Sequence, residues 1–303
     1  MNRRGSLAAL GCGAAAALGG CSLETEEERG GKPAQSPLAD ADTPAQVNTG
    51  RSYPLAWCFS SGGPRGFVHV GVLKALHELG LTPDLVVGSS VGALVGGLYA
   101  AGMPMAQMTA LALEASVISL FRLNIMGPGW INVAGVADLV NDAAAGRRLQ
   151  HFPTPFAAVA LAQGSNTLIA FNWGNAGLAV QAACSIEGQL APVRLRDQTY
   201  LDADLVSPMP VRLAKSLGAQ RVLAIDASAY EDQAPPGAES YRESDLRKRA
   251  LTEADARHAD LVLHPEFGYY TGVSREYRER TIEAGYRQTL LQSKPLRQLH
   301  GLL

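Results

Sequence analysis

The sequence predicts an α/β fold with a central, largely parallel sheet covered by helices. Apolar strand candidates alternate along the chain with glycine-containing turns and helical stretches, and this alternation favours parallel strands joined by crossover helices. The chain has 303 residues, of which 47% are hydrophobic and 18% charged, so it is long enough for one sizeable domain. No internal repeat is visible. One α/β domain is therefore the expected architecture.

Two strand–turn–helix units open the domain. The apolar run at residues 55–59 predicts the first strand. Residues 68–79 predict the helix after it, because apolar side chains recur there at helical spacing. The second strand is expected at 85–87 and its helix at 93–101. A glycine-rich turn separates the strand from the helix in each unit.

The remainder of the chain continues the alternation. A polar, proline-containing break follows residue 228, and the tail after it is expected to pack on the same domain. Strands are predicted at residues 156–161, 167–171, 221–226 and 260–263, and helices at 103–121, 136–149, 241–257 and 274–291.

A serine stands at the apex of the second glycine-rich turn, in the run Gly88-Ser89-Ser90-Val91-Gly92. A serine between glycines on a sharp strand-to-helix turn is typical of a nucleophile elbow. The glycines allow a tight, strained backbone and keep side chains away from the hydroxyl. Ser90 is then at the N-terminus of a helix, where free amides and the helix dipole favour developing negative charge. Ser90 is the candidate nucleophile.

The first glycine-rich turn is Ser61-Gly62-Gly63-Pro64-Arg65-Gly66. Its spacing does not fit a dinucleotide-binding turn, and it lacks the Gly-Lys-Ser/Thr ending of a P-loop. An oxyanion-binding loop fits better, because no Cβ shields the amides of Gly62 and Gly63 from a reacting carbonyl. Pro64 has no N–H to donate. An ordinary tight turn is the alternative.

The third motif is an acidic pair, Asp202-Ala203-Asp204, which follows a strand candidate and runs into a proline-rich turn. Alone it could be a solvated loop or half of a metal site. In combination, a glycine loop, then a serine elbow, then an aspartate resembles the patatin-like phospholipase family. The small-residue stretch at 179–188 also resembles the family's helix before its aspartate loop. The resemblance covers roughly residues 55–228.

The resemblance implies a three-layer αβα fold and hydrolysis of acyl esters, with a phospholipid or a similar lipid as the substrate. Ser90 would be the nucleophile and Asp202 the base, and the amides of Gly62, Gly63 and Arg65 would bind the oxyanion. Burial would have to raise the pKa of Asp202, because a carboxylate is a poor base at its reference pKa of about 4. No cofactor and no metal are expected. The apolar, glycine-broken loop at 123–131 is expected to border the substrate cleft.

The chain departs from the family pattern at two places. The family usually has Asp-Gly-Gly or Asp-Gly-Ala where this chain has Asp202-Ala203-Asp204, and glycine at the position of Ser61. Ala203 fits only if its backbone does not need a positive φ. Asp204 could face Asp202 and raise its pKa, or bind a cation; an exposed Asp204 is the favoured interpretation. The Arg65 side chain could bind a lipid phosphate or brace its loop by a salt bridge.

Two other function classes stay open. A Ser-His-Asp α/β-hydrolase would use one of the late histidines His258, His264 and His300, although its elbow usually follows several strands. A lipid-binding protein with impaired turnover is the non-enzymatic alternative. His69 and His77, on the first predicted helix, are interpreted as helix-face residues.

The N-terminus resembles a bacterial lipoprotein signal. Basic residues precede a weakly apolar stretch that ends in Leu18-Gly19-Gly20-Cys21. Residues 1–20 are predicted to be the signal peptide and Cys21 the lipidated residue, which places the protein in the bacterial cell envelope. Ser22 favours the outer membrane, facing the periplasm. Residues 21–51 are predicted to be a flexible acidic linker, 52–228 the hydrolase domain and 229–303 an extension packing on it.

Charge and cysteine content exclude several classes. The net charge is −2, which gives no electrostatic case for nucleic-acid binding. No apolar run inside the domain is long enough to span a membrane. Cys58 and Cys184 lie in apolar surroundings and are predicted to be buried thiols rather than a disulfide. No cysteine and histidine spacing matches a zinc site.

Overall fold

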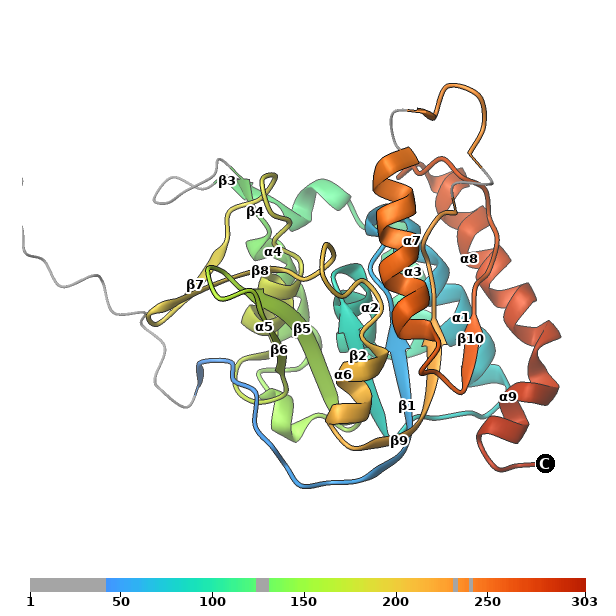
Figure 1. Cartoon of the computed structure of the whole chain (residues 1–303), viewed down its shortest axis with the longest axis horizontal. Coiled ribbons are helices and arrows are strands. Elements are labelled where there is room, and N and C mark those ends of the chain that lie inside the picture. Colours follow the sequence, from blue (N-terminus) through green and yellow to red (C-terminus); the bar gives the residue numbers. More distant parts are fainter. Residues whose placement is uncertain (1–41, 124–130, 231–233, 240–241) are drawn as a thin grey trace, which may run out of the picture. The chain divides into compact units, whose positions relative to one another are not determined.

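A computed structural model describes residues 42–123, 131–230, 234–239 and 242–303. The predicted signal peptide, Cys21 and most of the predicted linker lie outside these residues. Figure 1 shows a central sheet with helices on both faces, as predicted for an αβα fold. The order of its strands is β10-β9-β1-β2-β5-β8-β7, and β6 pairs with β5.

The strands fall into a parallel group and an antiparallel group. The parallel strands are β1 (Tyr53–Phe59), β2 (Leu85–Ser89), β5 (Phe156–Ala162), β9 (Ala219–Ile225) and β10 (Leu261–Leu263). The antiparallel strands are β6 (Thr167–Phe171), β7 (Val193–Leu195) and β8 (Gln198–Asp202). The sheet is therefore mostly parallel, as the alternation of elements predicted.

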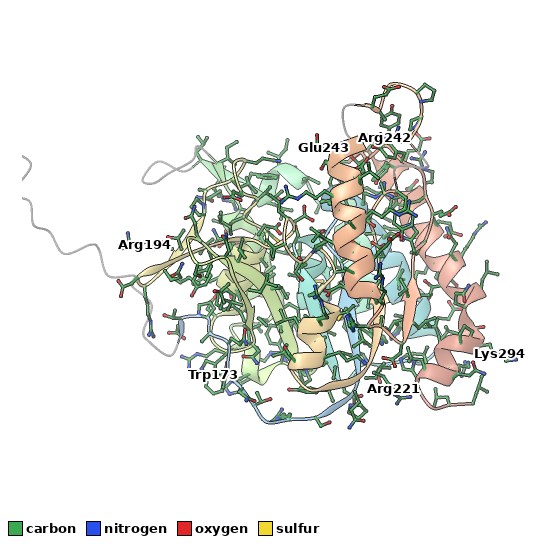
Figure 2. All side chains as sticks on the ribbon, in the orientation of Figure 1. Trp173, Arg194, Arg221, Arg242, Glu243 and Lys294 are labelled. Atoms are coloured by element: carbon green, nitrogen blue, oxygen red, sulfur yellow. The ribbon has the colours of Figure 1, made fainter. Side chains whose placement is uncertain are left out.

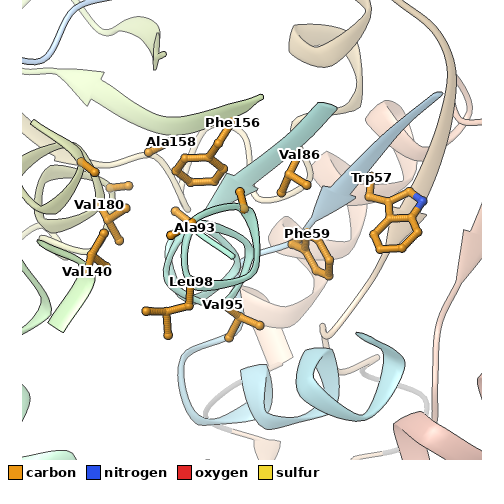
Figure 3. Close-up of a cluster of buried hydrophobic side chains, with 14 of the residues drawn as sticks. Trp57, Phe59, Val86, Ala93, Val95, Leu98, Val140, Phe156, Ala158 and Val180 are labelled. Carbon is orange, nitrogen blue, oxygen red and sulfur yellow. The ribbon is translucent and has the colours of Figure 1, made fainter. Parts of the chain in front are cut away.

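Two separate apolar clusters show that both faces of the sheet are covered. Along β1, Trp57 and Phe59 belong to one cluster, while Ala56 and Cys58 belong to the other. This follows from the period-2 geometry of a strand, which sends successive side chains to opposite faces. Figure 3 shows the first cluster around α2 (Val91–Ala100).

The helices divide between these faces. The first cluster includes side chains of α1 (Phe67–Glu78), α2, α3 (Met105–Glu114), α4 (Ala134–Ala143) and α5 (Ala176–Ala183). The second includes α6 (Val211–Ser216). α7 (Arg242–Ala256) contacts α6 and lies in front of the sheet in Figure 1. Charged side chains such as Arg194, Arg242 and Lys294 lie at the periphery (Figure 2).

The C-terminal segment packs closely on the first helix of the domain. α8 (Arg275–Leu291) crosses α1 with the two backbones in contact. A Cβ added at Gly71 would lie 1.9 Å from the carbonyl oxygen of Ile282, and one at Gly285 would lie 2.5 Å from that of Val68. Only glycine permits this approach. The described residues between 229 and 303 thus share a compact unit with the strands, and α9 (Ser293–Leu299) follows α8.

Two helices are shorter than predicted. α3 ends at Glu114 and is followed by a 3₁₀ turn at Val117–Leu120, because Arg278 from α8 takes the carbonyls of the last helical turn. α4 ends at Ala143 because Ala145 and Gly146 adopt positive φ values of 49° and 72°. A strand before Asp202 was predicted and is β8, but its hairpin partner β7 and the short helices α6 and α9 were not predicted from the sequence.

The described part of the predicted linker is bound to the domain. The Ala45 amide donates to the Trp173 carbonyl at 3.0 Å, and the Val47 amide donates to Asn172 Oδ1 at 2.8 Å. Asp42 pairs with Arg148 at 2.6 Å. The linker prediction was wrong for residues 42–47, because their backbone amides find acceptors just beyond β6.

The loop predicted at 123–131 is described only at its ends. Leu123 belongs to β3 (Arg122–Leu123) and Ile131 to β4 (Ile131–Asn132), which pair antiparallel. Residues 124–130 lie outside the described part of the chain. Among the described helices, none is long and apolar enough to span a bilayer.

Candidate active site

Ser90 occupies a strained turn between β2 and α2. Its φ of 52° and ψ of −126° lie outside the usual regions for a residue with a side chain. The glycines on either side make the turn possible. A Cβ at Gly88 would lie 2.4 Å from the Gly92 carbonyl oxygen, and one at Gly92 would lie 2.4 Å from that of Phe59. The backbone therefore presents Ser90 at the N-terminus of α2, as the elbow motif predicted.

The sheet register brings Asp202 to this turn. β5 extends beyond β2, so that Val159 is opposite Ser89 and the next residue, Ala160, is opposite Asp202. Asp202 is the last residue of β8, which runs antiparallel to β5. Ser90 and Asp202 are far apart in the sequence, but this register brings them close together at one edge of the sheet. Ser90 and Asp202 are 7% and 5% exposed.

Asp202 keeps one carboxylate oxygen free. Oδ1 accepts the Asp204 amide at 2.8 Å, whereas Oδ2 is buried with no hydrogen-bond partner among the described residues. Burial raises the pKa of Asp202 to about 7, although the nearby Ser90 hydroxyl lowers it in part. Ser90 thus lies beside the carboxylate without forming a hydrogen bond of ordinary geometry. Such loose contacts between catalytic partners are common in unliganded sites.

The Gly62–Gly63 loop lies beside the same serine. Gly63 has a φ of 53° and, with Ser90, lines one cavity. Among the described residues, the amides of Gly62 and Gly63 donate to no backbone carbonyl, which leaves both free to bind an oxyanion. The Arg65 amide differs, because it donates to the Gly62 carbonyl at 3.1 Å. This bond would have to break before the Arg65 amide could contribute.

The Arg65 side chain braces the loop through backbone carbonyls. Its guanidinium lies 4.3 Å from the centre of the Phe267 ring and is largely buried, and that burial lowers its pKa. The bracing role was one of the two sequence hypotheses, but hydrogen bonds provide it rather than the expected salt bridge. The acceptors are the carbonyls of Ala227 at 2.6 Å, Tyr269 at 2.9 Å, Gly268 at 3.1 Å and Ser228 at 3.2 Å.

An apolar cavity of about 330 Å³ opens beside Ser90. Its walls are side chains of α2, α3, α4 and the 3₁₀ turn at Val117–Leu120. Cys184 also lines it, and its thiol donates to the Ser90 carbonyl at 3.2 Å. Cys58 and Cys184 are both buried free thiols, and burial raises the pKa of each. The volume is at the lower end of the range for small-molecule sites.

None of the histidines lines this cavity. His264 lies 3.1 Å from Asp226, and the Trp57 indole donates to His300 at 3.3 Å, whereas His258 is exposed. His69 is fully buried, with Nε2 2.9 Å from the Ser60 carbonyl oxygen. Burial lowers its pKa to about 4. The arrangement around Ser90 thus offers a carboxylate, and among the described residues no imidazole, as a proton acceptor.

The two residues by which the Asp202 motif departs from the family pattern have separate outcomes. Ala203 is not among the residues with positive φ and is fully buried in the second apolar cluster. The favoured exposure of Asp204 was wrong, since its side chain is 19% exposed and contacts Lys248 and Ser61. The sequence analysis missed Lys248, because nothing near it in the sequence links it to the Asp202 motif.

Comparison with known proteins matches this chain to a protein family. The patatin-like phospholipase family model matches residues 57–215, more than half of the 303-residue chain. An uncharacterized NTE family protein of Mycobacterium bovis is 29% identical over 185 residues, which are 60% of this chain and 51% of that protein. The lysophospholipase nte1 of Emericella nidulans is 29% identical over 221 residues, 67% of this chain and 14% of that protein.

A solved structure shares the fold. VipD from Legionella pneumophila superposes with a TM-score of 0.55 at 14% sequence identity, over 87% of this chain and 72% of that one. The chain spans about half the length of the mycobacterial relative and a small part of the fungal one. The matched family region contains Ser90, Asp202 and the Gly62–Gly63 loop.

Proposed function

Because this chain belongs to the patatin-like phospholipase family, we propose that it is a serine acyl hydrolase that cleaves lipid acyl esters with a Ser90–Asp202 dyad. One observation carries the proposal. A buried carboxylate with a free oxygen lies beside a strained serine on the wall of an apolar cavity. Hydrolysis of a lipid ester fits the family, and the Ser90–Asp202 dyad is the mechanism proposed for this chain.

The proposed reaction has two stages. Asp202 accepts the Ser90 proton while Oγ attacks the ester carbonyl, and the amides of Gly62 and Gly63 bind the oxyanion. The tetrahedral intermediate collapses to an acyl-serine, and the leaving alcohol takes the proton from Asp202. Water then attacks the acyl-serine with Asp202 again as the base, which releases the fatty acid and restores the serine.

The environment of Asp202 suits it to this role. A carboxylate with an ordinary pKa is almost fully ionised at neutral pH but binds a proton weakly. Burial raises the pKa of Asp202 to about 7, so the group is a much stronger base that is still largely ionised in mildly alkaline solution. The free Oδ2 faces no competing donor among the described residues.

The cavity supports a lipid acyl chain as the bound group. Val117 and Leu120 line it, while Ile118 between them is 81% exposed to solvent. The same 3₁₀ turn therefore carries two apolar residues of the cavity wall and one apolar side chain on the outside of the protein. A phospholipid or another long-chain acyl ester is the proposed substrate class, and acyl length and head group are open to measurement.

Localisation is the other part of the proposal. The Leu18-Gly19-Gly20-Cys21 run supports lipidation of Cys21 and anchoring in the bacterial cell envelope, at the outer membrane facing the periplasm. More than one acyl chain on one residue gives firm anchoring, whereas one chain is marginal. Cys21→Ser should move the protein from the membrane fraction to the soluble fraction. A wild-type protein that is soluble and begins at another residue would contradict the anchor.

The function is tested by labelling with a fluorophosphonate, followed by mass spectrometry of the labelled peptide. We expect the label on Ser90, with both labelling and ester hydrolysis lost in Ser90→Ala. His258→Ala, His264→Ala and His300→Ala are the controls and should keep substantial activity. Label on Ser89, or a loss of about a thousandfold from one histidine in a folded variant, would favour another mechanism. Binding of lipid without turnover would support the non-enzymatic alternative.

A further inference from the structure

The Asp202 motif contains a second carboxylate that joins three segments of the protein. Asp204 donates its amide to Asp202 Oδ1 at 2.8 Å. Its own Oδ1 accepts the Ser61 hydroxyl, and its Oδ2 lies 2.6 Å from Lys248 Nζ. One residue therefore contacts the catalytic base, the start of the Gly62–Gly63 loop and α7.

These contacts fix the loop of the base relative to the loop that would bind the oxyanion. The Ser61 amide donates to the Pro208 carbonyl at 2.8 Å, so Ser61 is tied twice to the segment after Asp202. Asp204 and Lys248 are partly buried, with side chains 19% and 30% exposed. Lys248 belongs to α7, outside the family-matched residues. The Lys248–Asp204 ion pair thus connects α7, in the tail of the chain, to the loop of the base.

The charges of the pair act on Asp202 in opposite directions. The negative charge of Asp204 raises the pKa of Asp202, and the positive charge of Lys248 lowers it. Ser90 and Cys184 are the other groups facing this carboxylate. Lys248 also borders a small cavity together with Arg65 and Asp245. The Arg65 guanidinium donates to backbone carbonyls, and the Asp245 carboxylate accepts the Tyr269 hydroxyl.

We propose that Lys248 is a positioning residue for the catalytic base, which acts through Asp204 to hold the Asp202 loop in place and to cancel the second carboxylate's charge. The inference rests on the proposed Ser90–Asp202 chemistry. Where the family usually has Asp-Gly-Gly or Asp-Gly-Ala, this chain places a carboxylate two residues after the base. Lys248 compensates for that substitution, so the arrangement belongs to this chain and not to the family motif.

The experiment is a double-mutant cycle measured on the pH dependence of kcat/KM with a soluble short-chain ester and the full chain. Lys248→Met leaves Asp204 unpaired, so the acidic limb should move to higher pH. Asp204→Asn leaves Lys248 alone, so the limb should move to lower pH. Each shift should be roughly half a pH unit or more, the scale for partly screened charges a few ångströms apart. The double variant should return close to the wild-type limb.

Two control variants separate the effect of the Lys248 charge from an effect on the fold. Lys248→Arg keeps the positive charge and should keep the wild-type limb. Lys294→Met removes an exposed lysine on α9, which Figure 2 shows well away from Arg242 and Glu243 at the start of α7, and should change nothing. Single variants that leave the limb in place, or that move it in the same direction, would overturn the inference. A structural role alone would lower activity at every pH without moving the limb.

A second measurement keeps the inference apart from the proposed function. The difference in unfolding free energy between the wild type and the Asp202→Asn variant, followed against pH, reports the pKa of Asp202 without turnover. If no ester is hydrolysed, the proposed function fails. The same difference, measured in the Lys248→Met background, must still place the pKa of Asp202 at a higher pH. Absence of that shift would overturn the inference alone.

Discussion

Asp202 and Asp226 are both buried carboxylates, one at the end of β8 and one just after β9. Their pKa values nevertheless shift in opposite directions. They are 5% and 1% exposed. Burial raises the pKa of Asp202 to about 7. Burial acts in the same direction on Asp226, but its contacts with His264 and Ser228 outweigh it, so its pKa lies below the usual value.

The difference lies in the donors that each carboxylate receives. Asp226 accepts the Ser228 amide at 2.9 Å and the Tyr230 hydroxyl at 3.2 Å, and His264 Nδ1 lies 3.1 Å away. Asp202 accepts the Asp204 amide and keeps Oδ2 without a partner in the described structure. Burial alone therefore does not define a base. A buried carboxylate becomes a base when one oxygen is left without a donor beside the nucleophile.

The largest expected difference is in activity. Asp202→Asn should lower kcat/KM by roughly 10² to 10⁴, the range for loss of a general base. Asp226→Asn is the matched control, since it also neutralises a buried carboxylate near the same edge of the sheet. We expect it to keep most activity in the folded protein. Equal losses from the two changes, measured on a soluble ester, would remove the functional distinction between them.

The second difference is in stability and has opposite signs for the two residues. Asp226→Asn should destabilise the fold by roughly 3 kcal/mol, because the partners of a buried charge are left without it. Asp202→Asn should stabilise the fold at pH 8 by roughly 2–4 kcal/mol, since the wild-type protein buries an ionised group whose pKa is raised. Chemical denaturation of both variants beside the wild type gives the two numbers.

The two stability changes should also depend on pH in opposite ways. The raised pKa of Asp202 means that the folded state binds more protons, so its effect on wild-type stability becomes unfavourable as pH rises from about 4 to about 7. The stabilising gain of Asp202→Asn should therefore appear across that window. The lowered pKa of Asp226 works in reverse. Its contribution is present above pH of about 4 and is lost as pH falls through the lowered value.

The acidic limb of kcat/KM should follow Asp202 and not Asp226. Activity should fall below a pH of about 7, as the base takes up a proton. Asp226→Asn should leave the midpoint of this limb unchanged. A midpoint near pH 4 in the wild type would show that the base has an ordinary carboxylate pKa, and so contradict the assignment of Asp202.

The smallest effect is expected from Tyr230→Phe. It removes one donor from Asp226 and should cost about 1 kcal/mol of stability, the usual size for one hydrogen bond. Activity at neutral pH should stay within error of the wild type.

Ser90→Ala is the counterpart at the other carboxylate. It removes the hydroxyl that lowers the pKa of Asp202, so the pH window of Asp202 seen in unfolding should move upward.

Local sequence predicted the backbone better than the contacts. The strands at β1, β2, β5, β6 and β9 and the elbow at Ser90 follow from apolar runs bounded by glycine turns. The prediction failed where a distant residue ended an element. α3 stops at Glu114 because Arg278, far along the chain, binds its last carbonyls. Residues 42–47 were assigned to the linker by composition, yet Asn172 and Trp173 bind their backbone.

Local sequence specifies part of the turns that the chemistry needs, because Gly88 meets a steric demand of its own turn and Gly63 adopts a positive φ, whereas Gly92 makes room for the Phe59 carbonyl on β1. It also marked Ser90 and Asp202 through the motifs around them. The protonation and the contacts of these groups depend on the folded structure. The pKa of Asp202, the pairing of Asp204 with Lys248 and the capture of Arg65 by carbonyls depend on elements that are distant in sequence. Backbone strain is local, whereas burial and electrostatic interactions depend on what the fold brings together.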